Sequence, residues 1–188
     1  MRIAPLLPLA VIAALACDPD PDLRCAQEGA RVDADAIALI DPARWTATPA
    51  ELDPLADHRP ADGLCEPSDW GEEYGTLEVS TAACSYVSLD QPLAADLEVG
   101  DRLRVRVWWA TLLAEAPATA HLALLVDGAL LWETHVDIPG SADARVFELA
   151  SPIAADAGAL VTFHLHNHGQ NTWTLAGVER ARVDDGCE

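Results

Sequence analysis

Residues 102–109 alternate between apolar and polar side chains, and this alternation is the strongest constraint that the sequence places on the fold. Leu103, Val105, Val107 and Trp109 take every second position, and three arginines and Trp108 take the others. Successive side chains of a β-strand point to opposite faces, so the segment predicts a strand with one buried and one solvated face. Such a strand is typical of an antiparallel sheet that packs one face on a core.

Short apolar segments separated by turn residues continue on both sides of this strand, from Gly75 onward. The expected strands span residues 76–80, 85–89, 102–111, 120–126, 130–138, 145–150, 160–167 and 172–183. Asp127-Gly128, between two of these segments, is typical of a two-residue hairpin turn. About eight strands without a long helix predict an all-β chain folded as an antiparallel β-sandwich.

Residues 26–70 are different, because they are rich in turns and prolines. A first strand is expected at 36–40. Thr48-Pro49-Ala50-Glu51 predicts a helix start with Thr48 as the cap, and the helix must be short because Pro54 follows. We expect this turn-rich part to wrap around the sandwich, anchored by Trp45 and Trp70, and not to form a separate domain.

The N-terminus predicts export. Residues 1–16 contain Arg2 followed by an apolar run that is too short to cross a bilayer, which is typical of a signal peptide. The end of this run resembles a lipobox: Ala16 and Cys17 match it, whereas Ala14 and Leu15 depart from it. The resemblance implies lipidation of Cys17, with residues 17–24 as a charged tether and 25–188 as one domain on the bacterial cell envelope. Plain secretion remains the alternative.

Four further cysteines predict two disulfides, since an even number in an exported chain indicates cross-links. Four cysteines allow three pairings, of which we favour Cys65–Cys84 and Cys25–Cys187. A zinc site made of the four thiolates is disfavoured because no C-x-x-C spacing is present.

The charge restricts the partners. The chain carries 31 acidic against 11 basic residues, a net charge of −20, so phosphate backbones are repelled and nucleic-acid binding is not expected. Asp33 with Asp35, or Asp184 with Asp185, offers turn oxygens for structural calcium, although no EF-hand spacing is present.

Three segments carry a family resemblance: Ser85 to Leu93 (SYVSLDQPL), Val99 to Trp108 (VGDRLRVRVW) and Thr172 to Val178 (TWTLAGV). Residues 76–183 resemble the galactose-binding-like jelly roll shared by many carbohydrate-binding modules. The resemblance implies a jelly-roll β-sandwich with a binding role and a glycan as ligand. One departure is clear, because Ala176-Gly177 stands where that family usually has an acidic pair.

Histidines gather on one expected sheet face. Within 160–167, Val161, Phe163 and Leu165 point inward, so His164, His166 and, beyond them, His168 point outward. If strand 120–126 lies beside 160–167, and 130–138 beyond it, the outward positions also include His121, Glu133, His135 and Asp137. On 130–138 the inward positions are Leu130, Trp132, Thr134 and Val136. Of the six histidines, only His58 is expected to lie elsewhere.

This histidine face predicts a transition-metal site for zinc or copper. The expected ligands are His121, His135, His164 and His166, and His168 and Glu133 are additional candidates. Two alternatives remain open: the face binds a glycan or another polar ligand, or its histidines only form hydrogen bonds across strands.

A second candidate site lies at Trp108. It points to the solvated face with Arg104 and Arg106, whereas Trp109, Trp132 and Trp173 are expected in the core. The ring would stack on a sugar or on the guanidinium groups. The alternative is that residues 26–70 cover it.

No catalytic motif is present: the chain has no G-x-S-x-G, H-E-x-x-H or Walker A sequence, and adjacent Glu72 and Glu73 are not specific. The sequence therefore predicts a non-catalytic, membrane-tethered binding or structural module whose partner is a glycan or an envelope protein. The alternative function is extracytoplasmic binding of a transition metal.

Overall fold

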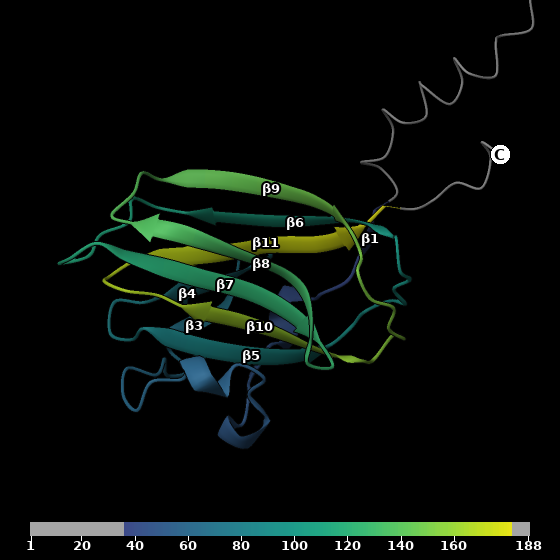
Figure 1. The fold of residues 1–188 in the computed structure, drawn as a ribbon, viewed down its shortest axis with the longest axis horizontal. Coiled ribbons are helices and arrows are strands. Elements are labelled where there is room, and N and C mark those ends of the chain that lie inside the picture. The colour runs from purple at the N-terminus through teal and green to yellow at the C-terminus, as the bar shows by residue number, and fades with distance from the viewer. Residues whose placement is uncertain (1–35, 182–188) are drawn as a thin grey trace, which may run out of the picture.

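Two antiparallel sheets packed face to face form the protein in the computed structural model, which describes residues 36–181 (Figure 1). The strands are β1 (Ile37–Ala38), β2 (Thr46–Ala47), β3 (Trp70–Glu73), β4 (Thr76–Ser80), β5 (Tyr86–Pro92), β6 (Arg102–Trp109), β7 (Ala118–Val126), β8 (Ala129–Ile138), β9 (Asp143–Ala150), β10 (Leu160–His166) and β11 (Thr172–Arg180). All eight expected strands are present, and the all-β prediction is confirmed.

The strand order defines the topology. Sheet A has the order β3-β4-β11-β6-β9, with β1 also paired to β11, and sheet B has the order β2-β5-β10-β7-β8. From β4 to β11 every connection crosses between the sheets except the β7–β8 hairpin. This alternation is the jelly-roll arrangement, so that prediction is confirmed. It also places β10 between β5 and β7, as the histidine argument required.

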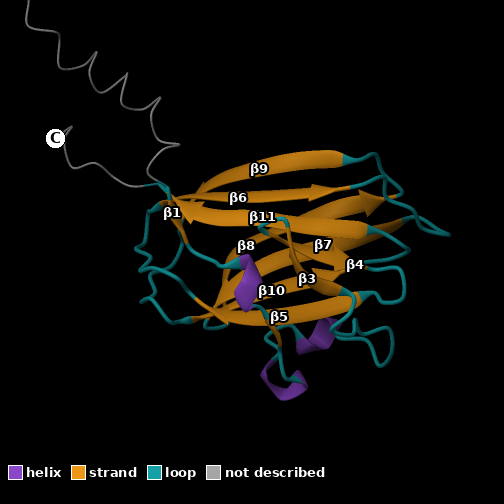
Figure 2. Ribbon diagram, turned by 180° about the vertical axis from the view of Figure 1, so that it is seen from behind, coloured by secondary structure: helices purple, strands orange, loops and turns teal. Residues whose placement is uncertain are grey.

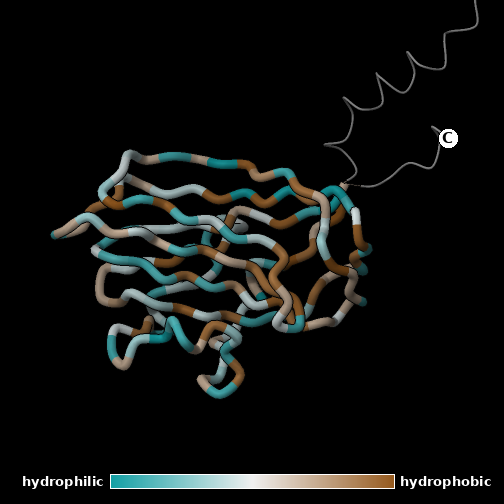
Figure 3. Tube along the Cα trace, in the orientation of Figure 1, coloured by the Kyte–Doolittle hydropathy of each residue, from teal (hydrophilic) through white to brown (hydrophobic). Residues whose placement is uncertain are grey.

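The core lies between the sheets and consists of the inward side chains of the alternating strands. Leu103, Val105 and Val107 of β6 are at most 2% exposed, and Trp109 of β6 packs on Trp173 of β11 with ring centroids 5.3 Å apart. Hydrophobic and hydrophilic residues alternate along the tube of the chain (Figure 3). On β6 the burial follows this alternation, with the apolar residues in the core and the arginines on the outer face.

One expected orientation is wrong. Strict alternation predicts that Leu130 points inward like Trp132, but Leu130 is 45% exposed and its neighbour Leu131 is buried. The pairing of β7 with β8 shifts between Leu124 and Leu125, so that Leu131 is an extra residue on β8. A bulge of this kind reverses the faces of the residues beyond it, and periodicity alone cannot locate it.

The segment 39–69, which we call the wrap, contains three short 3-10 helices: η1 (Pro42–Arg44), η2 (Ala50–Leu52) and η3 (Ala56–His58). Two of them lie beyond the β5 edge of the sandwich (Figure 2). Trp45 is buried as expected, packs on Phe163 with ring centroids 6.1 Å apart, and anchors the wrap. The predicted cap at Thr48 is wrong: Pro49 precedes η2, and the Thr48 amide continues the sheet by donating to the Ser88 carbonyl at 2.9 Å.

The Cys65–Cys84 disulfide is confirmed and ties the wrap to the segment just before β5. The predicted signal peptide, the predicted Cys17 tether, the predicted Cys25–Cys187 pair and the four aspartates considered as calcium ligands lie outside the described residues. Between residues 36 and 181, no helix is long and apolar enough to cross a membrane.

A buried amide network closes the loop between β10 and β11. Asn167 is fully buried, and its side-chain oxygen accepts from the Trp173 indole at 3.0 Å and from the Asn171 amide at 3.1 Å. Gly169 lies inside this loop with φ +85°, and a Cβ there would lie 1.9 Å from the Leu113 carbonyl oxygen. The network therefore needs glycine at this position.

Replacing Gly169 by alanine should destabilise the protein strongly, because the added Cβ collides with backbone. Gly75→Ala is the matched control, since Gly75 also has a positive φ, +78°, but nothing lies within 4 Å of its added Cβ. Chemical unfolding should show that Gly169→Ala loses at least about 2 kcal/mol more than Gly75→Ala. Equal losses in the two variants would contradict the loop geometry.

Candidate functional site

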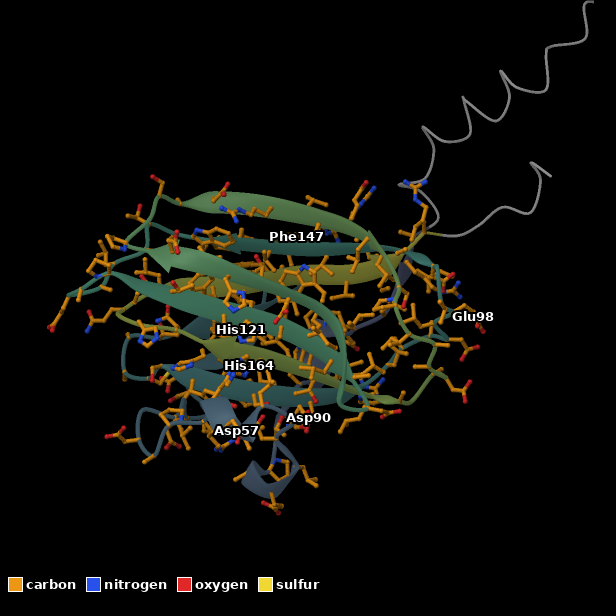
Figure 4. All side chains as sticks on the ribbon, in the orientation of Figure 1. Asp57, Asp90, Glu98, His121, Phe147 and His164 are labelled. Carbon is orange, nitrogen blue, oxygen red and sulfur yellow. A yellow bond between two sulfur atoms is a disulfide. The ribbon has the colours of Figure 1, made fainter. Side chains whose placement is uncertain are left out.

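The outer face of sheet B carries the histidines as predicted. His121 on β7 is the register partner of both His166 on β10 and His135 on β8, and His164 lies on β10 beside Ala123. His121 and His164 lie close together on these neighbouring strands, with Asp57 of the wrap on the β5 side (Figure 4).

His58 also belongs to this group, so the prediction that it lies elsewhere is wrong. It is the last residue of η3, and its ring centroid lies 5.5 Å from that of His121 and 5.7 Å from that of His164. The wrap turns back over the sheet at this point. Sequence periodicity gives no register between a loop and a sheet, so no pattern places His58 there.

Asp53 holds the wrap in this position. Its buried carboxylate accepts hydrogen bonds from the Tyr86 hydroxyl, from the Leu55 amide at 3.0 Å and from the Arg59 guanidinium at 3.1 Å. Burial alone would raise the pKa of Asp53, but the bonds from Tyr86, Leu55 and Arg59, with His164 nearby, hold it below its ordinary value. Burial and the Asp53 bond raise the pKa of Tyr86 far above its ordinary value, so the phenol stays a donor.

His164 is the most unusual residue of the face. Its side chain is fully buried, yet neither ring nitrogen has a hydrogen-bond partner among the described residues. Buried polar atoms are almost always partnered, and leaving one without a bond costs about 1–3 kcal/mol. Burial, reinforced by His121, lowers the pKa of His164 to about 3, so the ring is neutral at neutral pH.

His121 has one satisfied nitrogen and one free nitrogen. Its Nε2 lies 2.9 Å from a Glu133 carboxylate oxygen, and its buried Nδ1 has no partner among the described residues. Burial lowers the pKa of His121, although Glu133 opposes this effect. The His135 ring stacks on it with centroids 4.4 Å apart and planes 6° apart.

The predicted metal ligands do not form one cluster, because this geometry places them in two groups and leaves His166 outside both. His58, His121 and His164 form one group whose ligand atoms lie within 4.8 Å of one another, and His121, Glu133 and His135 form a second. His166 belongs to neither group: its ring contacts those of His168 and Tyr86, at 4.9 and 5.8 Å between centroids.

The outer face of sheet A carries the second candidate site. Trp108 is 39% exposed there, so residues of the wrap do not cover it fully. The guanidinium of Arg104 lies 3.3 Å from Glu148, and that of Arg106 is paired with Glu179.

A bulge in β11 makes room for the Arg106 guanidinium on this face. The pairing of β11 with β6 shifts between Leu175 and Gly177, and a Cβ on Gly177 would lie 2.9 Å from the Arg106 guanidinium. Gly177 thus lets the guanidinium lie against the sheet.

The comparisons with known proteins concern the fold. No protein-family model and no curated protein matches the chain. Among solved structures, a CBM4 carbohydrate-binding module is 14% identical, covering 61% of this chain and 76% of its own, with a TM-score of 0.38. CBM36 in complex with calcium and xylotriose is 16% identical, covering 60% and 92%, with a TM-score of 0.35. Dimeric latent PorU from Porphyromonas gingivalis is 15% identical, covering 79% and 13%, with a TM-score of 0.40. Likeness at this level does not transfer a ligand.

The metal-free protein, kept in a chelator, should lose stability as the pH falls from about 6.5 toward 3. The pKa of His164 is lowered from 6.5 to about 3 in the fold, so within this window the unfolded chain binds a proton that the folded chain does not. The loss should reach the order of about 4 kcal/mol, and the lowered pKa of Asp53 adds to it at the acid end.

Unfolding curves measured at several pH values test this. His164→Leu should reduce the pH dependence, of which His121 and His166 keep a part because burial lowers their pKa values too, and His168→Leu, which changes an exposed ring beyond the same strand, should preserve it. A His164→Leu protein that is as acid-sensitive as the parent would refute the assignment.

Proposed function

We propose that the chain is a non-catalytic binding module that binds a glycan on the outer face of sheet A. The observation that carries the proposal is the exposed indole of Trp108 on the same face of β6 as Arg106, the next residue on that face, and Arg104 beyond it, both of which carboxylates hold in place. An exposed tryptophan ring on a sheet face offers a broad apolar surface with one N–H donor. Sugar rings present a C–H face and a rim of hydroxyls, which suits such a platform.

The arginines supply the polar part of the proposed site. A guanidinium is a planar donor of several hydrogen bonds. Glu148 and Glu179 fix the positions of Arg104 and Arg106, so less side-chain freedom is lost when a ligand binds. Arg102 and Arg104 line a hollow with Glu148 and Glu179, but this hollow lies at the other end of β6 from Trp108.

The row of residues across the sheet from Trp108 supports the same function. Thr174 of β11 is its register partner, and Glu78 of β4 is the next in line. The Thr174 hydroxyl is buried with no partner among the described residues, and burial, with Glu73 beside it, raises the pKa of Glu78. Thr174 is only 1% exposed, so within this row a ligand can reach the Trp108 indole and the partly buried Glu78 carboxyl on either side of it.

The location proposed for this module is outside the cytoplasm. The lipobox-like sequence ending at Cys17 supports a lipid anchor on the cell envelope. The Cys65–Cys84 disulfide supports an oxidising compartment.

Trp108→Ala should remove glycan binding. Titration calorimetry of the purified chain against a panel of oligosaccharides measures it, because fluorescence would change with the loss of the ring itself. We expect a loss of at least about tenfold in affinity, as for a central aromatic contact.

Tyr74→Ala is the control, since Tyr74 is an aromatic residue that is 95% exposed in the turn between β3 and β4. It should bind like the parent. Full affinity in Trp108→Ala, or a parent chain that binds none of the panel, would exclude this face as a glycan site.

A further inference from the structure

We propose that His58, His121 and His164 bind one divalent transition metal ion of the kind that prefers imidazole, such as Zn²⁺ or Cu²⁺. One ligand atom from each of the three lies within 4.8 Å of the others. The site lies on sheet B, whereas the proposed glycan face lies on sheet A, so the two proposals are independent.

His164 gives the first argument. Its ring is fully buried, packs against both other rings and has no hydrogen-bond partner on either nitrogen among the described residues. Its neighbours in the group are imidazoles, and a neutral imidazole nitrogen without a proton cannot bond to another of the same kind. A metal cation would take one lone pair from each of the three rings together, and the protonated nitrogen of His164 would still have no partner among the described residues.

His121 gives the second argument, because its surroundings match those of a metal ligand. Histidines that bind metals usually donate the N–H of their other nitrogen to a carboxylate or carbonyl, which fixes the tautomer. The contact from His121 Nε2 to Glu133 at 2.9 Å fills this role. It places the proton on Nε2 and leaves the partnerless Nδ1 as the donor to a metal.

The ring planes select this group over the neighbouring one. A metal ion bound to an imidazole lies close to the plane of that ring. The planes of His121 and His135 are only 6° apart in a stacked pair, so they do not converge on a common point. The planes of His58, His121 and His164 are inclined to one another by 58–63°, with centroids 5.0–5.7 Å apart, and such planes intersect.

The adjustment that the ion requires is small. Nitrogens that each lie about 2.0–2.1 Å from one tetrahedral ion are roughly 3.4 Å apart. The ligand atoms of the three histidines now lie up to 4.8 Å apart, so this separation must decrease by somewhat more than 1 Å. His164 is fixed by burial, but His58 is exposed at the end of η3 and can rotate toward it.

The donor set and the nearby charges determine the kind of ion. Three imidazoles suit zinc or copper, whereas calcium and magnesium require oxygen ligands. Glu133 bonds to His121, and the Asp53 carboxylate acts electrostatically on His164, so two negative groups compensate the dication. Three protein ligands leave a fourth position for water or another ligand.

A bound ion would fasten the wrap to the sheet. His58 belongs to the wrap, whereas His121 and His164 belong to β7 and β10. The ion would thus add a third connection to the Asp53 hydrogen bonds and the Cys65–Cys84 disulfide.

Titration of the tag-free, disulfide-intact chain with Zn²⁺ tests the proposal by calorimetry. The parent should bind one ion per chain with a rise in melting temperature, and Co²⁺ in its place should give the visible absorption of a tetrahedral site. His58→Ala should weaken zinc binding by at least about tenfold, since loss even of outer hydrogen-bond partners has effects of that size. His58 is exposed, so this variant keeps its fold.

His168→Ala is the control, because it removes an exposed histidine outside the group, and it should bind zinc like the parent. Zinc should also protect the wrap from proteolysis in the parent and in His168→Ala, but not in His58→Ala. A parent chain that binds no zinc overturns the proposal. Binding that survives His58→Ala but is lost in His135→Ala also overturns it, because the ion then lies on the second group.

Discussion

Packing of alternate side chains between the two sheets is the constraint on which the rest of the structure depends. Once Val161, Phe163 and Leu165 of β10 enter the core, His164 and His166 must point to the other side of sheet B. The same rule on β6 buries Val107 and exposes Trp108. Both candidate sites are therefore consequences of where the apolar residues lie.

The wrap partly encloses the outer face of sheet B, which would otherwise be an open surface. Without it, His164 would be a solvated residue on a sheet. With Asp53 held by Tyr86 and Arg59, η3 carries His58 over the strands, and the buried nitrogens lose their access to water. Sheet A keeps its face open at Trp108, so the two sides suit ligands of different size and chemistry.

Periodic sequence patterns predicted the strands and their faces. Features without a periodic pattern, such as a bulge or the path of a loop, were missed. The alternation predicted the strands and the outward histidines, and the resemblance to a jelly roll implied the strand order. The alternation missed the extra residue Leu131, because a bulge adds one position without a sign in the pattern. It also missed His58, because a loop has no periodicity that relates it to a sheet. The Thr48 motif had the right residues for a helix cap, but a backbone bond to Ser88 holds this residue in the sheet.

The Cys65–Cys84 bond relates the histidine group to the redox state of the chain's surroundings. This bond closes a loop between the wrap and the entrance to β5, and such a link restricts the unfolded ensemble more than the folded one. A chain whose thiols stay reduced must order the wrap against the sheet without that restriction. The three imidazoles would then meet less often, so reducing surroundings would weaken the proposed metal site.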